Sequence, residues 1–123
     1  MKTILLIGSG GFLGSVARYG LQHVMHKIIP TAFPFGTLLV NIIGCFIIGL
    51  IYGSVGKSNW LTEDWKLFLA IGICGGFTTF SSFSYENIKL MQEGQTFQAL
   101  LYIAASVIVG LAMTYIGILI SGK

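Results

Sequence analysis

The chain has 123 residues, of which 54% are hydrophobic and 9% are charged, and its mean hydropathy is +0.86. This composition excludes an ordinary soluble domain, in which about a quarter of the residues are charged. The net charge of +3 does not indicate nucleic-acid binding, because the seven basic residues are scattered along the chain, as is typical of membrane flanks. The sequence therefore predicts an integral membrane protein.

Intervals without Asp, Glu, Lys or Arg give the expected topology. They predict an all-α membrane protein with four transmembrane helices, in a single domain over residues 1–123. A helix of roughly 20 residues spans a hydrocarbon core of about 30 Å. The approximate spans are residues 3–21, 35–55, 66–90 and 97–120. The first interval is short, but its helix can continue past Arg18, because a long basic side chain can extend its charge outward.

Small residues recur every four positions in the first span. Gly10, Gly14 and Arg18 share one helix face at this spacing, and Gly11 begins a parallel row. Small residues at such intervals are typical of membrane helices that pack closely. We expect this face to contact another helix.

The second span carries Thr37, Asn41 and Cys45 along one face. The carboxamide of Asn41 offers two N–H donors and one acceptor, and inside a membrane it usually faces protein or water. An interhelical hydrogen bond and a role in a polar pathway both remain open. Cys45 and Cys74 are expected to be buried thiols rather than a disulfide or a metal site.

The third span is predicted to be broken at its midpoint. Residues 75–83 read GGFTTFSSF, and adjacent glycines followed by hydroxyls disfavour a continuous helix. Irregular backbone at that depth is tolerated only where protein buries it or where it lines a cavity. If the helix resumes after the glycines, Phe80 and Phe83 share a face, and the partly positive edges of their rings can accommodate an anion. Ordinary apolar packing of the two rings is the alternative.

The fourth span carries Tyr102, Ser106, Gly110 and Thr114 at intervals of four, so that they form a polar stripe. Helix contacts and a wetted groove both account for it. No charged residue lies near the middle of any span, so a small hydrogen-bond-accepting anion is the ligand that fits best. The sequence shows no nucleophile with a base, metal-ligand cluster or phosphate loop, so we do not expect an enzyme.

The positive charges do not choose an orientation. With four spans, Lys2, Lys57, Lys66 and Lys123 fall on one side, and Arg18, Lys27 and Lys89 fall on the other. This near balance predicts that the chain inserts both ways up. Because four helices enclose little space, we expect a dual-topology antiparallel homodimer.

Residues 75–83 resemble the GGxTTFSTF-type motif of the CrcB/Fluc family of fluoride channels. Residues 10–19 and 36–44 and the polar stripe of the fourth span agree with the same family. One departure is Ser82, where threonine is more usual, and serine keeps the hydroxyl.

The resemblance implies a passive, fluoride-selective channel that exports fluoride across the bacterial inner membrane and confers fluoride resistance. It also implies an antiparallel homodimer with two pores and a structural sodium ion at its centre, held by the backbone carbonyls of Gly75 and Thr78. Phe80 and Phe83 would be ring-edge fluoride sites, with Asn41 beside them. Further candidates for the hydrogen-bonding track are Thr37, Ser81, Tyr102, Ser106 and Thr114.

Two other functions stay open on the residues alone. A small dual-topology multidrug or cation exporter needs an embedded acid, and the nearest is Glu86. We expect Glu86 to lie in a vestibule and to pair there with Arg18. A non-transporting membrane scaffold would explain every polar stripe as packing.

Overall fold

The computed structural model describes residues 1–57 and 59–122, and it is helical throughout apart from short connections. Four helices are long and apolar enough to cross a membrane, which confirms the predicted all-helical, four-span fold. The first is α1 (Lys2–Ile28), the second is α2 (Phe35–Gly53) and the fourth is α6 (Thr96–Ser121). The third, Glu63–Gln92, is divided into α3 (Glu63–Lys66), η1 (Leu67–Cys74), α4 (Gly75–Phe77) and α5 (Ser81–Gln92).

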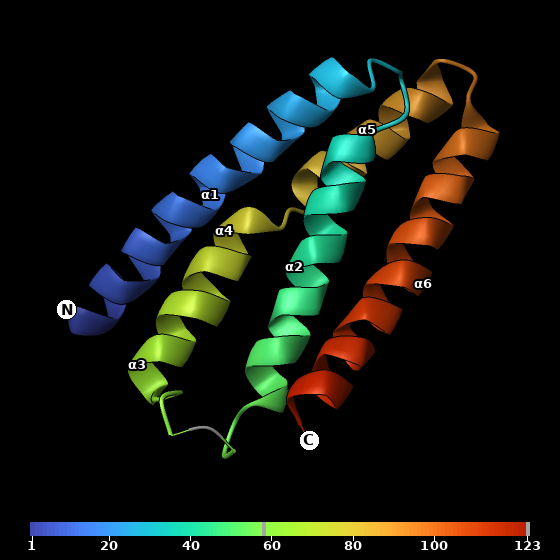
Figure 1. The fold of residues 1–123 in the computed structure, drawn as a ribbon. Helices are drawn as coiled ribbons and strands as arrows, with labels where there is room; N and C mark the ends of the chain where they lie inside the picture. The colour runs from blue at the N-terminus through green and yellow to red at the C-terminus, as the bar shows by residue number, and fades with distance from the viewer. Residues whose placement is uncertain (58, 123) are drawn as a thin grey trace.

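The four spans form two pairs (Figure 1). α1 packs along η1 and α4, and α2 packs along α6, while α5 crosses to the side of α6. Both termini lie at the end of the molecule where the 54–62 connection lies, and the 29–34 and 93–95 connections lie at the other end. This arrangement is the one that four successive spans require.

Glycines bring the backbones of α1 and the third span into contact. A Cβ on Gly10 would lie 2.5 Å from the Phe68 carbonyl oxygen, and a Cβ on Gly14 would lie 2.1 Å from that of Ile73. From the other side, a Cβ on Gly76 would lie 2.5 Å from the Gly11 oxygen. The predicted close packing through the four-residue repeat of the first span is therefore confirmed.

Very little of the protomer is buried. The buried apolar side chains form two small clusters, one around Ile51, Ala70 and Cys74 and the other around Leu90, Ala99 and Tyr102. Large apolar side chains are exposed along all the spans. Such a surface is stable only against lipid or another protein, as expected for a membrane protein. Cys74 is buried as predicted, whereas Cys45 is half-buried, and both thiols are free.

The third helix stops one turn later than the glycine pair would suggest. Gly75 and Gly76 remain helical in α4, and the backbone turns extended at Thr78, with φ −86° and ψ 158°. The helix resumes at Ser81, after residues 78–80. The hydroxyl-rich half of the motif therefore holds the break, while the small surface of Gly76 lets α1 approach.

Candidate functional site

The side chain of Asn41 fixes the break from α2. Its Nδ2 donates to the Thr79 carbonyl oxygen at 3.0 Å, and the Thr79 backbone N–H donates to its Oδ1 at 2.9 Å. A carboxamide can replace a peptide partner in this two-way manner because it carries both a donor and an acceptor. Asn41 thus satisfies backbone groups that an interrupted helix would leave unpaired.

The carbonyls of Gly75 and Thr78 are among those at the break that lose their helical donors. In a continuous helix Thr79 N–H would bond to the Gly75 oxygen, but it bonds to Asn41 instead. Ser82 N–H would bond to the Thr78 oxygen, but it donates to Thr79 Oγ1 at 3.2 Å. Carbonyl oxygens released in this way suit a hard cation, which takes oxygen ligands. The donor set at Gly75 and Thr78 therefore fits the sodium site that the resemblance implies.

Arg18 occupies a different position from the one predicted. Its Nε donates to the Gly76 carbonyl oxygen at 3.0 Å, so the guanidinium is held at the end of α4. The salt bridges among the described residues join Lys2 to Asp64 and Lys66 to Glu63. The predicted pairing of Arg18 with Glu86 is therefore wrong for the protomer, because a carbonyl at the break takes the guanidinium.

A cavity of about 390 Å³, called here the break pocket, lies beside Asn41 and the break. The rings of Phe80 and Phe83 are 5.6 Å apart between centroids and inclined at 43°, so the predicted shared face is confirmed. Ser106 Oγ is buried without a hydrogen-bond partner among the described residues. No charged side chain contributes to the described lining, which consists of Asn41, Gly44, Cys45, Ile48, Thr78, Thr79, Phe80, Phe83, Ser106 and Val107.

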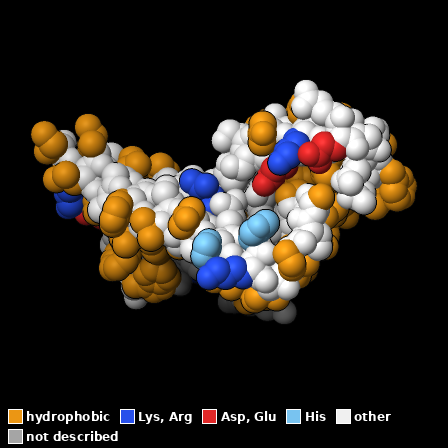
Figure 2. Space-filling view, turned by 90° about the horizontal axis from the view of Figure 1, so that it is seen from above, with side chains coloured by type: hydrophobic (Ala, Val, Ile, Leu, Met, Phe, Trp, Pro, Cys, Tyr) orange, Lys and Arg blue, Asp and Glu red, His pale blue; other side chains and the backbone are white. Residues whose placement is uncertain are grey.

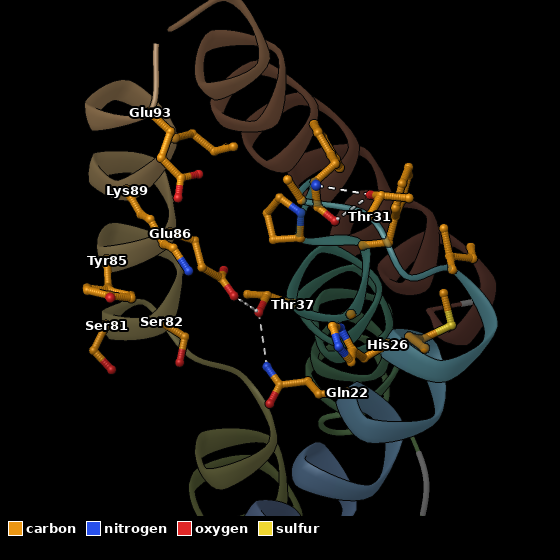
Figure 3. Close-up of a pocket in the computed structure, with 18 residues that line it drawn as sticks. Gln22, His26, Thr31, Thr37, Ser81, Ser82, Tyr85, Glu86, Lys89 and Glu93 are labelled. Atoms are coloured by element: carbon orange, nitrogen blue, oxygen red, sulfur yellow. Dashed lines mark hydrogen bonds between the residues drawn. The ribbon is translucent and has the colours of Figure 1, made fainter. Parts of the chain in front are cut away.

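A larger cavity of about 800 Å³, called here the vestibule, opens at the end of the molecule where the 29–34 and 93–95 connections lie. It lies between α1, α2 and α5, and Figure 3 shows Gln22, Thr37 and Glu86 meeting across it. Viewed onto this end, Figure 2 shows a hollow with histidine, basic and acidic side chains around it. Ser81 belongs to the vestibule lining, and its Oγ lies 3.3 Å from Thr79 Oγ1 at the break.

Glu86 is held in the vestibule by two hydroxyls. Thr37 Oγ1 donates to its Oε2 at 2.8 Å, and Tyr102 Oη donates to its Oε1 at 2.8 Å. The Tyr102 ring is fully buried and lies 4.9 Å from the Phe83 ring between centroids. Tyr102 therefore connects the vestibule to the aromatic wall of the break pocket.

The structure brings most of the predicted site residues together, but not all. Phe80, Phe83, Asn41 and Ser106 line the break pocket, and Thr37, Ser81 and Glu86 line the vestibule. Thr114 lies in neither lining, and its Oγ1 donates to the Cys45 carbonyl oxygen at 3.0 Å between α6 and α2. Its position supports helix packing rather than the predicted polar track.

Two polar residues of this region were not among the predicted site residues. Thr79 Oγ1 caps the first turn of α5, and Gln22 donates to Thr37 at 3.0 Å. The signal for Gln22 was present, since it continues the four-residue series of Gly10, Gly14 and Arg18 on the packed face of α1. Thr79 carried no comparable signal, because its role depends on where the helix breaks.

Comparison with known proteins identifies relatives over nearly the whole chain. The family model of CrcB-like protein, Camphor Resistance, matches residues 5–118. A protein of Flavobacterium psychrophilum named fluoride-specific ion channel FluC is 49% identical over 121 residues, which are 98% of this chain and 98% of the relative. Two further similar proteins carry the same name. The one from Azobacteroides pseudotrichonymphae is 43% identical over 98% of this chain and 97% of the relative. The one from Geobacter sulfurreducens is 46% identical over 97% of this chain and 96% of the relative.

Proposed function

This chain belongs to the CrcB-like protein family, and we propose that it is a fluoride-selective passive channel that exports fluoride from the cytoplasm across the plasma membrane and so lowers its toxicity. The supporting observation is the break pocket, which combines aromatic rings, the Asn41 amide and the unpartnered Ser106 hydroxyl with no charged side chain in its described lining. Ring edges and hydroxyl donors can replace the water shell of a small anion. A site without fixed charge also lets the ion leave.

The driving force needs no coupled ion. Hydrogen fluoride crosses lipid as a neutral molecule and ionises in a near-neutral cytoplasm, where the anion is trapped. An inside-negative membrane potential favours exit of the anion by roughly 2.3 kcal/mol per 100 mV. A passive path is therefore sufficient for export.

We propose that the working unit is an antiparallel homodimer in which both copies contribute to each pathway. Phe80 is 77% exposed in the protomer although it lines the break pocket, so a second copy would complete the wall beside it. The near balance of positive charge on the two sides supports insertion in both orientations. An interface with two-fold symmetry would place the two breaks against each other.

A structural sodium ion between the copies is a further part of the proposal. Gly75 and Thr78 would hold it through the carbonyl oxygens whose helical donors are engaged elsewhere. When bound, the ion would offset the partial negative charge of carbonyls that meet at the dimer centre. The unwound backbone of the site does not depend on the ion, because the hydrogen bonds of Asn41 and Thr79 keep the helix open at the break.

Reconstitution into liposomes tests the proposed function. Purified protein should release fluoride rapidly on a fluoride electrode, with negligible chloride movement and with no requirement for a proton gradient. A multidrug or cation exporter would instead require a cationic substrate and a proton gradient. Well-folded protein that releases no fluoride would reject the channel and favour a scaffold.

A further inference from the structure

Gln22 ends a chain of hydrogen bonds in the vestibule. Its Nε2 donates to Thr37 Oγ1 at 3.0 Å, and Thr37 Oγ1 lies 2.8 Å from Glu86 Oε2 (Figure 3). Tyr102 Oη lies 2.8 Å from the other oxygen of Glu86. The chain joins α1, α2, α5 and α6, and its two hydroxyl-bearing side chains are almost fully buried.

With Glu86 ionised, the direction of each bond follows from proton counting. An amide nitrogen only donates, so the Thr37 oxygen is the acceptor of the bond from Gln22. The single hydroxyl proton of Thr37 is then left for Glu86, and the single proton of Tyr102 goes to the second carboxyl oxygen. Both oxygens of an ionised Glu86 are then satisfied as acceptors, so this arrangement favours the carboxylate form.

We propose that Gln22 is a positioning residue, which keeps the Thr37 hydroxyl directed at Glu86 and thereby holds Glu86 ionised at the mouth of the pathway. The proposal rests on the proposed function only in placing this network on the fluoride route. A proton taken up by Glu86 would reverse one bond, so that Thr37 would accept from both Gln22 and Glu86. The Thr37 proton would then be free to turn toward an anion in the vestibule.

Other titratable groups face the same cavity. His26 lines it from α1, Tyr85 and Lys89 line it from α5, and Glu93 lines it from the residue that follows α5. α6 contributes Tyr102 through its bond to Glu86, and the described lining from α2 and from residues 29–34 carries no titratable side chain. Histidine is the residue type most often used as a pH switch, so the contribution of His26 must be separated from that of Glu86 in any test.

The titration of Glu86 can be followed directly in the full-length protein. The chain has three glutamates, Glu63, Glu86 and Glu93, so labelling the glutamate carboxyl carbons with ¹³C gives few signals, and Glu86→Gln identifies the one of interest. Gln22→Met keeps a similar length and removes the donor. In this variant the midpoint of the Glu86 titration should move to higher pH by about one unit, which corresponds to the loss of one modest hydrogen bond.

Controls separate this role from a general disturbance of the vestibule. Met25→Leu changes the same helix and lining without touching the chain and should leave the midpoint in place. His26→Gln should leave the difference between the wild-type protein and Gln22→Met intact. In a Thr37→Val background, Gln22→Met should have no further effect, because Gln22 acts through that hydroxyl.

The proposal would be overturned if Glu86 titrated with the same midpoint in Gln22→Met as in the wild-type protein, or if it did not titrate in either protein. It would also be overturned if the effects of Gln22→Met and Thr37→Val on that midpoint were fully additive. If Gln22→Met does not fold, the wild-type protein still decides. The side-chain amide signal of Gln22 should shift with the midpoint of Glu86, and an amide signal that does not respond would overturn it. Liposome efflux is measured independently, so a missing flux rejects the proposed function without changing this result.

Discussion

At the scale of single residues, Asn41 does more than a polar side chain in a membrane usually does. Its amide oxygen takes the Thr79 N–H away from the Gly75 carbonyl, and its amide nitrogen satisfies the Thr79 carbonyl. One side chain therefore stabilises the break, releases a backbone oxygen and borders the break pocket. The alternatives of a helix contact and a pathway residue, both open in the sequence, are not exclusive.

Asn41→Asp should reduce fluoride efflux at least tenfold. A carboxylate cannot donate to the Thr79 oxygen, and it places a negative charge beside a carbonyl and across the proposed anion route. We expect a loss of stability of about 1–3 kcal/mol from the unsatisfied carbonyl. Efflux from liposomes and thermal unfolding measure the two effects. Asn59→Asp makes the same change at an exposed position between α2 and α3 and should preserve efflux.

Phe80→Ile should abolish most fluoride efflux while the protein still assembles. Isoleucine keeps an apolar side chain but lacks a ring edge for the anion. Because Phe80 is 77% exposed in the protomer, its replacement leaves the protomer core unchanged. Phe97→Ile is the matched control, since Phe97 is 72% exposed and lies in the described lining of neither cavity. Equal efflux from the two variants, measured with a fluoride electrode, would argue against a ring-edge site.

At the scale of helices, glycine spacing decides which elements touch. α1 and the third span meet backbone to backbone at Gly10, Gly14 and Gly76. α2 and α6 meet in the same way, since a Cβ on Gly49 would lie 2.2 Å from the Thr114 oxygen. In lipid the hydrophobic effect does not drive helices together, so this close approach has to supply the packing energy.

Gly14→Ala should destabilise the protein, because its Cβ would meet the Ile73 oxygen at 2.1 Å and two rigid backbones would have to separate. A cost of about 1–3 kcal/mol is expected from overpacking, larger than the gain of about 1 kcal/mol in helix propensity. Gly8→Ala on the same helix meets nothing within 4 Å and should be neutral or stabilising. The stabilities of Gly14→Ala and Gly8→Ala are compared by unfolding each variant in detergent and following the loss of helix by circular dichroism. Equal stability of the two variants would contradict the contact.

At the scale of the whole molecule, the single chain leaves a ring of the break pocket uncovered. Phe80 is exposed at the break and lines the break pocket, whereas it does not belong to the lining of the vestibule. The proposed antiparallel dimer would cover this surface and build two pathways from both copies. This assembly requires that the chain be present in both orientations.

Both orientations should be found in the same membrane preparation. Asn59→Cys places an exposed thiol in the 54–62 connection without changing the charge. An impermeant maleimide added outside sealed cells should label roughly half of the protein, as expected for unbiased insertion. The remainder should react only after permeabilisation. The unmodified chain is the control, since Cys74 is buried and Cys45 lies half-buried within α2. Labelling from one side alone would refute dual topology.

The sequence alone determined the four spans, the small-residue faces and the segment in which the third span is interrupted, because hydrophobic length and residue spacing act locally. The exact break, at residues 78–80 rather than at the glycines, came from the structure. The resemblance to the CrcB/Fluc family also placed Asn41 beside Phe80 and Phe83. What only the tertiary structure decided is which partner each polar group takes: Arg18 goes to Gly76, Thr114 to Cys45, and Glu86 to Thr37 and Tyr102. These choices depend on which backbone groups the break leaves unpaired within reach, and helical spacing carries no information about that.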